Sequence, residues 1–339
     1  MQKINSSKYP PRFLKTLGIL LCVFLLLSSQ KVMAQEKYRW STVKSGEGLN
    51  AFLLRNHLSP KKFTEKFINL NKNRLNKQGQ LIAGRKYKIP LRFPIHTNPL
   101  FGKKYERIVQ KDNQLKGGIY YLVSGHGGPD PGAIGKISGH TVTEDEYAYD
   151  IILRLARNLM EHGAKVELII RDKDDGIRDQ KFLLPDTDER CYPDQTIPRK
   201  QTPRLHQRAA AINILSKKNR GYKHKRLVAI HLDSRSKKNR TDVFFHYHSK
   251  SKKGKEFALN LQNTFRDKYA KHQPNRKYTG TVSSRRLYIL TTTLPPSAFI
   301  ELGNINNYRD QLRFLKKENR QALADWICDG IIRDYKAQK

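Results

Sequence analysis

The sequence contains few cysteines, with three among its 339 residues. Only Cys191 and Cys328 lie beyond the N-terminal segment, and two cysteines in a chain of this length do not make a disulfide framework. The absence of any Cys-x-x-Cys pair excludes a thiolate zinc site of the zinc-finger kind. A single bridge between Cys191 and Cys328 and two unpaired thiols both remain consistent with the sequence.

Long apolar runs are also scarce, and the only one extends from Leu17 to Leu27. Four basic residues precede it, and Val32-Met33-Ala34 follows with a small residue at a cleavage point. This pattern predicts a secretory signal peptide over residues 1–34. The alternative, a membrane anchor, is disfavoured because the run is too short to span a bilayer. We therefore expect an exported mature chain with no membrane span, acting in the periplasm, the cell envelope or the exterior.

The sequence contains far fewer acidic than basic residues, with 30 Asp and Glu and 66 Lys and Arg. The leader holds five basic residues and no acids, so its removal lowers the formal charge from +36 to +31. Such a charge indicates a polyanionic partner. An exported protein rarely meets nucleic acid, so we expect anionic cell-envelope polymers and no nucleic acid. The alternative is that the charge serves solubility alone.

Hydrophobic periodicity divides the mature chain into a small unit at 40–92, a polar linker at 93–116 and a large domain at 117–337. In the large domain, apolar strands alternate with helical patterns, which predicts an α/β sheet covered by helices. The expected strands are 118–124, 165–170, 226–231, 242–247, 286–290 and 298–302, and the expected helices are 144–162, 204–218, 254–270 and 318–336. The stretch 172–203 has no periodicity, and a loop of this length is usually functional or disordered.

The small unit reads as strand, helix, helix and strand. Its sequence V-K-S-G-E-G-L at 43–49, its Leu70-Asn71 pair and its G-x-x-Y-x-I-P ending at 84–90 resemble a LysM module. This α+β module binds the N-acetylglucosamine-containing glycans of peptidoglycan and chitin. Gly46-Glu47-Gly48 replaces the usual Gly-Asp-Thr, so one helix cap is lost. The alternative is a small α/β domain of another kind.

Four residues of the large domain point to a metal centre. His126 lies in the glycine-rich turn S-G-H-G-G-P-D-P-G-A-I-G, two residues beyond the first strand, and His231 ends the apolar strand Leu227-Val228-Ala229-Ile230. Side chains at the carboxyl ends of strands gather at one edge of an α/β sheet. Two such histidines can share a metal with a carboxylate and leave one position for water. Glu301 interrupts an apolar strand, which is costly unless the charge is paired or functional.

Three consecutive acids, Glu144, Asp145 and Glu146, could supply the carboxylate. Glu144 shares a helical face with Tyr147, Ile151, Leu155 and Leu159, so it points at the sheet. Thr143-x-x-Glu146 matches a capping box, which explains Glu146 without a metal. All three acids also suit the positive end of a helix. The helix face selects Glu144 as the ligand.

Other polar residues were weighed for the same role. His246 and His248 lie on one face of a strand and form a rival metal pair that lacks a third ligand. Asp130 and Asp233 lie close in sequence to His126 and His231, so we expect them to hold those rings rather than the metal.

The large domain resembles the zinc-dependent N-acetylmuramoyl-L-alanine amidases. The resemblance rests on G-H-G-G-x-D-P-G-A-x-G around His126, the acid Glu144 opening the next helix, the Ile230-His231 strand end, and Glu301-Leu302-Gly303. It implies a twisted, mostly parallel α/β sheet flanked by helices, with His126, Glu144 and His231 as Zn²⁺ ligands and Glu301 as the catalytic acid and base. The implied reaction is hydrolysis of peptidoglycan between N-acetylmuramic acid and L-alanine.

Two other functions remain open at this point. The same metal site could serve a zinc peptidase that acts on the stem peptide of the wall. The domain could also be a non-catalytic scaffold or activator that binds peptidoglycan, although retention of all four chemical residues argues against it.

Overall fold

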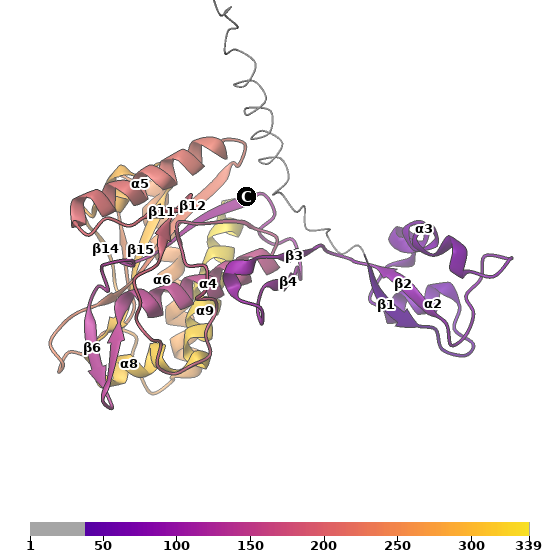
Figure 1. Ribbon diagram of the computed structural model, residues 1–339, viewed down its shortest axis with the longest axis horizontal. Coiled ribbons are helices and arrows are strands. Elements are labelled where there is room, and N and C mark those ends of the chain that lie inside the picture. The colour runs from indigo at the N-terminus through magenta and orange to yellow at the C-terminus, as the bar shows by residue number, and fades with distance from the viewer. Residues whose placement is uncertain (1–37, 339) are drawn as a thin grey trace, which may run out of the picture. The chain divides into compact units, whose positions relative to one another are not determined.

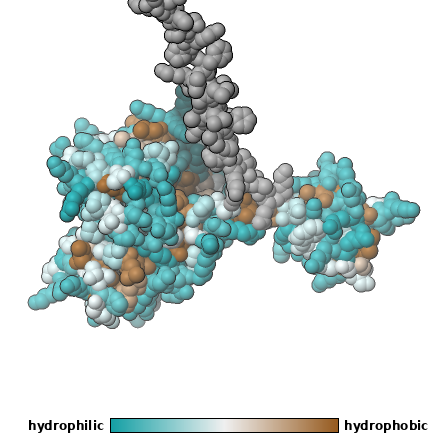
Figure 2. Space-filling view, in the orientation of Figure 1, coloured by the Kyte–Doolittle hydropathy of each residue, from teal (hydrophilic) through white to brown (hydrophobic). Residues whose placement is uncertain are grey.

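The computed structural model describes residues 38–338, and the signal peptide predicted for residues 1–34 lies outside them. No helix between residues 38 and 338 is both long and apolar enough to cross a membrane. The face shown in Figure 2 is mostly hydrophilic, with small separated apolar patches, as the high content of charged residues leads one to expect.

The first unit follows the predicted order. It consists of β1 (Tyr38–Thr42), α2 (Leu49–Arg55), α3 (Pro60–Asn71), a 3₁₀ turn (Lys72–Arg74) and β2 (Lys86–Pro90). β1 and β2 pair antiparallel, and their inner face packs on both helices through a core that includes Phe52, Phe67 and Tyr87 (Figure 1). The Asn71 amide donates to the Lys88 carbonyl at 2.7 Å, which ties the end of α3 to β2. Gly48 supplies no side-chain cap to α2, as the sequence predicts.

The large domain is built on a six-stranded sheet in the order β14-β13-β15-β12-β5-β8. Its strands are β5 (Gly118–Ser124), β8 (Lys165–Leu168), β12 (His224–Asp233), β13 (Phe244–Tyr247), β14 (Val282–Ser284) and β15 (Ser297–Asn304). Only the β13–β15 pair is antiparallel within this sheet. The predicted α/β class with a mostly parallel sheet is therefore confirmed.

Helices cover both faces of this sheet (Figure 1). Tyr120 and Leu122 of β5 face the larger core, which is closed by α4 (Glu144–Glu161), α6 (Lys252–His272) and α9 (Lys317–Ala337). Ile119, Tyr121 and Val123 face the opposite core, with α5 (Gln201–Lys218) and α7 (Tyr288–Thr292). The alternation follows from the two-residue period of a strand. Because both faces are buried, β5 is a continuous apolar run rather than an alternating one.

The segment 93–116, predicted to be a linker, is instead folded. It forms β3 (Ile95–Thr97), a 3₁₀ turn (Pro99–Phe101) and β4 (Arg107–Val109). Phe101, Ile108 and Leu115 are fully buried in the larger core of the large domain. Three scattered apolar side chains are enough to bury a short hairpin, although they show no periodicity along the chain.

One further sequence prediction is wrong, and one helix was not predicted. Residues 286–290, expected to be a strand, enter the short helix α7, whose Ile289 and Leu290 pack on the core. The four-residue apolar run 287–290 does not distinguish a buried strand from a buried helix. The sequence also missed the helix α8 (Tyr308–Leu315).

The stretch 172–203 is largely irregular but packed. It contributes β10 (Arg190–Cys191) and β11 (Gln195–Thr196), which extend β9 (Ile170–Arg171) into a small antiparallel sheet. Cys191 and Cys328 are both buried and unpaired, so the structure supports free thiols.

Candidate metal centre

His126 is presented by a strained turn at the carboxyl end of β5. Its φ of 56° lies in the left-handed region, and Gly127 and Gly128 follow with φ of 98° and 64°. The Asp130 carboxylate lies 2.7 Å from His126 Nδ1, so it fixes the ring and leaves Nε2 for a ligand. Arg208 of α5 donates to the His126 carbonyl and holds the turn from the other side.

Two glycines of the turn are required by the space that the ligand side chains occupy. A Cβ at Gly132 would lie 2.7 Å from the His126 ring and 2.7 Å from Glu144 Oε2. A Cβ at Gly125 would collide with the His231 ring. The glycine-rich sequence around His126 therefore serves close packing of the site as well as the turn.

Glu144 is the first residue of α4 and joins the two histidines. Its Oε1 lies 2.8 Å from His231 Nδ1, and its Oε2 lies 3.2 Å from His126 Nε2. The amides of Leu232 and Ala133 donate to the same two oxygens at 3.0 and 2.9 Å. The carboxylate is thus held between two strand ends by four contacts.

The structure brings the three predicted ligands together. One donor atom each from His126, Glu144 and His231 lies within 4.8 Å of the others. Two imidazole nitrogens and one carboxylate suit zinc, which accepts this donor set in catalytic sites and leaves a fourth position open.

The charges at the site favour an anionic Glu144. Burial opposes ionisation of Glu144, but hydrogen bonds to His126 and His231 outweigh it and lower its pKa below the usual range. Burial also lowers the pKa of His231, whereas hydrogen bonds to Asp130 and Glu144 overcome burial and raise the pKa of His126 to about 9. A cation between these groups would take the place of the proton that His126 otherwise holds.

Glu301 lies beside this group on the neighbouring strand β15. Its backbone is in register with His231 of β12, and it shares the sheet face of Phe299, which stacks on the His231 ring at 4.3 Å. Its Oε2 is buried and has no hydrogen-bond partner among the described residues. Burial, with smaller contributions from the charges of Glu144 and Asp233, raises the pKa of Glu301 to about 8. Glu301 is therefore placed to exchange a proton with a group bound at the site.

Comparison with known proteins gives the family of the chain. A family model described as N-acetylmuramoyl-L-alanine amidase matches residues 121–333. The chain belongs to this family. It is 24% identical over 225 residues to the germination-specific N-acetylmuramoyl-L-alanine amidase of Bacillus subtilis (strain 168), which covers 65% of this chain and 81% of that protein. The prediction that the chain hydrolyses peptidoglycan is confirmed by this membership.

Solved structures of similar proteins include two amidases. The CwlD amidase from Clostridioides difficile, in complex with the GerS lipoprotein, is 20% identical with a TM-score of 0.49, covering 66% of this chain and 100% of that chain. The amidase Ami1 from Mycobacterium smegmatis is 19% identical with a TM-score of 0.47, covering 66% of this chain and 99% of that chain.

The amidase site opens into a cleft of about 230 Å³. His126, His231 and Phe299 line one wall, and α5 and α7 supply Arg204, Arg208 and Tyr288. Arg204 forms an ion pair with Asp130, which connects the cleft wall to the His126 ring. Arg204 and Arg208 lie four residues apart and therefore share one face of α5, a spacing that is visible in the sequence.

Two sequence predictions around the amidase site are wrong, those for Glu146 and Asp233, whereas the expectation that His246 lacks further metal ligands agrees with the described part of the chain. Glu146 does not cap α4, because its carboxylate accepts from Arg178 at 2.7 Å and from the Asp186 amide at 3.0 Å. Asp233 pairs with Arg235 rather than with the His231 ring, which Glu144 holds instead. His246 bonds to Ser283, and within residues 38–338 no group of three metal-binding side chains includes it.

Proposed function

We propose that the chain is a zinc-dependent amidase that cleaves the bond between N-acetylmuramic acid and L-alanine in peptidoglycan. The observation that carries the proposal is the convergence of His126, Glu144 and His231, with Glu301 on the next strand. The donor set fits zinc by its chemistry, since two nitrogens and one hard oxygen come together without a thiolate. Asp130 orients one of the nitrogens, as carboxylates do for histidine ligands of metals.

The reaction needs a proton acceptor and later a proton donor. Bound zinc would polarise the scissile carbonyl and lower the pKa of a water molecule. Glu301 accepts the proton of the attacking water on its unpaired Oε2 and delivers it to the nitrogen of the departing L-alanine. Phe244 of β13 lies opposite Glu301 in the sheet, and Phe299 lies two residues before it on the same face of β15, so Glu301 has apolar neighbours. Arg204 and Arg208 line the cleft, where their positive charge would favour the carboxylates of the wall peptide.

The N-terminal unit would hold the enzyme on its substrate. The strand-helix-helix-strand order of residues 38–90 supports the proposed LysM-like module, and its glycan binding would raise the local concentration of the wall. Trp40 is 46% exposed on the sheet face that does not pack on the helices, where an aromatic ring can contact a sugar.

Export and charge complete the proposal. A signal peptide at residues 1–34 would direct the enzyme to the envelope, where its charge of +31 would attract anionic polymers. The attraction is non-specific and screened by salt, so it would assist localisation rather than select the bond that is cut.

The proposal is tested by the products that residues 35–339 release from purified peptidoglycan. We expect peptides with a free N-terminal L-alanine, loss of activity with a chelator and recovery with Zn²⁺. Glu301→Gln should lower kcat by about 10²–10⁴-fold, because a general acid and base is lost while the ligands stay. The matched control Glu318→Gln, an exposed residue at the start of α9, should leave kcat unchanged.

Other products would reject the proposal. Cuts within the stem peptide would identify a zinc peptidase, and cut glycosidic bonds would exclude both amide hydrolases. A purified wild-type protein that binds the wall without releasing peptides would identify a scaffold.

A further inference from the structure

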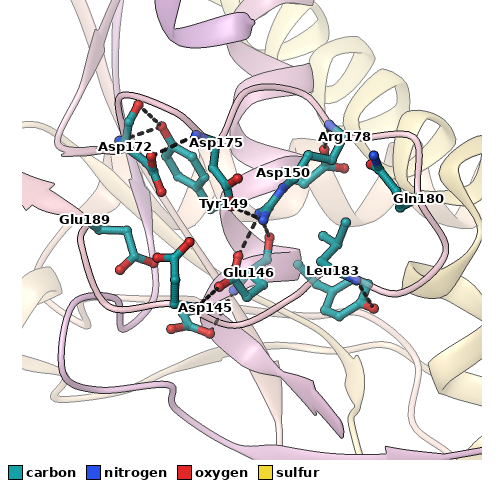
Figure 3. Close-up of polar contacts among 12 residues, drawn as sticks. Asp145, Glu146, Tyr149, Asp150, Asp172, Asp175, Arg178, Gln180, Leu183 and Glu189 are labelled. Carbon is teal, nitrogen blue, oxygen red and sulfur yellow. Dashed lines mark hydrogen bonds and ion pairs between the residues drawn. The ribbon is translucent and has the colours of Figure 1, made fainter. Parts of the chain in front are cut away.

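The acids of this basic chain are concentrated beside the amidase site. Residues 172–189 hold seven Asp and Glu and only three Lys and Arg, whereas the whole chain carries +36. This segment packs against the start of α4, where Asp145 and Glu146 follow the ligand Glu144 (Figure 3). An acidic segment in such a chain is not explained by composition.

The carboxylates form a connected set, which we call the acidic cluster. It contains three overlapping groups, and within each the ligand atoms lie within 4.8 Å of one another. The innermost group consists of Asp145, Glu146 and Glu189. Glu146 also belongs to the second group, with Asp175 and Asp186. Asp186 in turn belongs to the third group, with Asp172 and Asp188. Figure 3 shows Asp145 and Glu146 of α4 beside Asp172, Asp175 and Glu189 of the irregular segment.

The innermost group is buried and short of positive charge. Asp145, Glu146 and Glu189 are 1%, 2% and 4% exposed. Glu146 pairs with Arg178 at 2.7 Å, but no described Lys, Arg or His lies within ion-pair distance of Asp145 or Glu189. Two carboxylates are therefore buried together without a Lys, Arg or His partner among the described residues, which is costly unless something neutralises them.

The two oxygens of the Asp145 carboxylate have different surroundings. Its Oδ1 accepts from the Glu146 amide, whereas its buried Oδ2 makes no hydrogen bond of normal geometry with a described residue, and the Thr143 hydroxyl, which interacts with this carboxylate, is the nearby protein donor. The same side chain lies in the innermost group with Glu189, whose Oε2 accepts from the Gly128 amide at 2.6 Å. Buried polar atoms are nearly always paired, so an unpaired carboxylate oxygen facing a second carboxylate indicates a bound cation or a proton.

We propose that the acidic cluster binds a divalent cation of the Ca²⁺ type through Asp145, Glu146 and Glu189. All available ligands are oxygens, and the cluster offers no histidine or cysteine. Hard cations such as Ca²⁺ take six to eight oxygen ligands from carboxylates, carbonyls and water, which suits an irregular acidic segment. The site differs from the candidate zinc centre in its donors, and the proposal does not rest on the proposed amidase activity.

The position of the cation gives it a structural role. Asp145 directly follows Glu144, and Glu189 holds the amide of Gly128, two residues beyond His126. A cation between them would tie the start of α4 and the His126 turn to the irregular segment. The cluster would thereby hold in place the backbone that carries two of the three ligands of the candidate metal centre.

A shared proton is the competing explanation. Burial raises the pKa of Asp145 to about 7 and that of Glu189 to about 8, so either group could stay protonated near neutral pH. A protonated pair would need no cation, and calcium titration separates the two explanations.

The experiment titrates Ca²⁺ into the zinc-loaded chain of residues 35–339 by calorimetry at pH 7.5 and measures Tm in parallel. We expect one Ca²⁺ per chain with a Kd of about 10⁻³ M or tighter, the range of extracellular modules, and a Tm that rises with Ca²⁺. The double variant Asp145→Asn with Glu189→Gln should bind Ca²⁺ at least about tenfold more weakly. The matched control Asp194→Asn, an exposed acid paired with Lys173, should bind Ca²⁺ as the wild type does.

Two results would overturn the proposal. Absence of Ca²⁺ binding by the folded wild type, with no effect on Tm up to millimolar Ca²⁺, would assign the pair to a shared proton. Unchanged affinity in the double variant would place the cation elsewhere. If the double variant does not fold, the wild-type stoichiometry and Tm shift still decide, and neither readout depends on peptidoglycan cleavage.

Discussion

The contact between Asp130 and His126 allows a quantitative test of the candidate metal centre. In Asp130→Asn the carboxylate that lies 2.7 Å from His126 Nδ1 becomes a neutral amide of the same shape. The ring keeps its position in the turn, but its orientation and the basicity of Nε2 lose the support of a charge. Arg204 also loses its ion-pair partner on the cleft wall. We expect weaker zinc binding by a folded protein.

The magnitude follows from the role of such carboxylates. Loss of a carboxylate that holds a histidine ligand lowers metal affinity by about 10–100-fold, which corresponds to about 1.4–2.7 kcal/mol. The side chain of Asp130 is 20% exposed, so solvent screens part of the charge and the lower end of this range is the better expectation. Loss of a ligand itself, as in His126→Ala, should weaken zinc binding further.

Zinc affinity can be measured by competition with a chromophoric chelator at fixed pH. The control is Asp194→Asn, the same chemical change in an exposed ion pair with Lys173 in which the side chains are 58% and 74% exposed. Equal zinc affinity of Asp130→Asn and the wild type would refute the reasoning that Asp130 orients a ligand. A change of similar size in Asp194→Asn would show that the effect is one of total charge.

Three further predictions concern the packed interior. Phe101→Ala should lower the free energy of unfolding by about 3–5 kcal/mol in a denaturant titration, because Phe101 belongs to the core, whereas Val109→Ala at an exposed position (44%) should change it little; equal effects would contradict the burial of segment 93–116. Burial raises the pKa of Tyr149, so the folded chain keeps a phenol proton that the unfolded chain loses above about pH 10. The free energy of unfolding should therefore fall as the pH rises through about 10. Absorbance at 295 nm, which reports the ionised phenol, should rise together with unfolding. Cys191 and Cys328 should react with a thiol reagent only in denaturant, since burial raises the pKa of both thiols; fast labelling of the native chain would contradict this.

Much of the large domain follows from local pattern. The strands β5, β12 and β15 were predicted within a few residues, because fully buried parallel strands are continuous apolar runs. The helices α4, α5, α6 and α9 were also predicted, since a long amphipathic pattern with helical periodicity is compatible with a helix but not with a strand. The candidate ligands His126 and His231 could be picked out because each follows or ends such a strand.

Short and irregular segments did not follow from pattern. The run 286–290 is compatible with either a buried strand or a buried helix, and the α7 helix is decided by contacts with the core. Segment 93–116 folds because Phe101 and Ile108 find a surface on α4, which lies far along the chain. Thr143 and Glu146 have capping-box spacing, but a stronger partner, Arg178, takes the Glu146 carboxylate.

The sequence alone determined the α/β class, the glycine-rich turn of His126 and the identity of the three candidate ligands, since periodicity and motif spacing are local properties. Tertiary structure decided which partner each acid has. Glu144 meets His231 across 87 residues, and Glu189 meets Gly128 across 61. The energy of a buried carboxylate depends on what surrounds it in space. The helix face could select Glu144, but no pattern along the chain could show that Glu146 pairs with Arg178 while Asp145 has no cationic partner among the described residues.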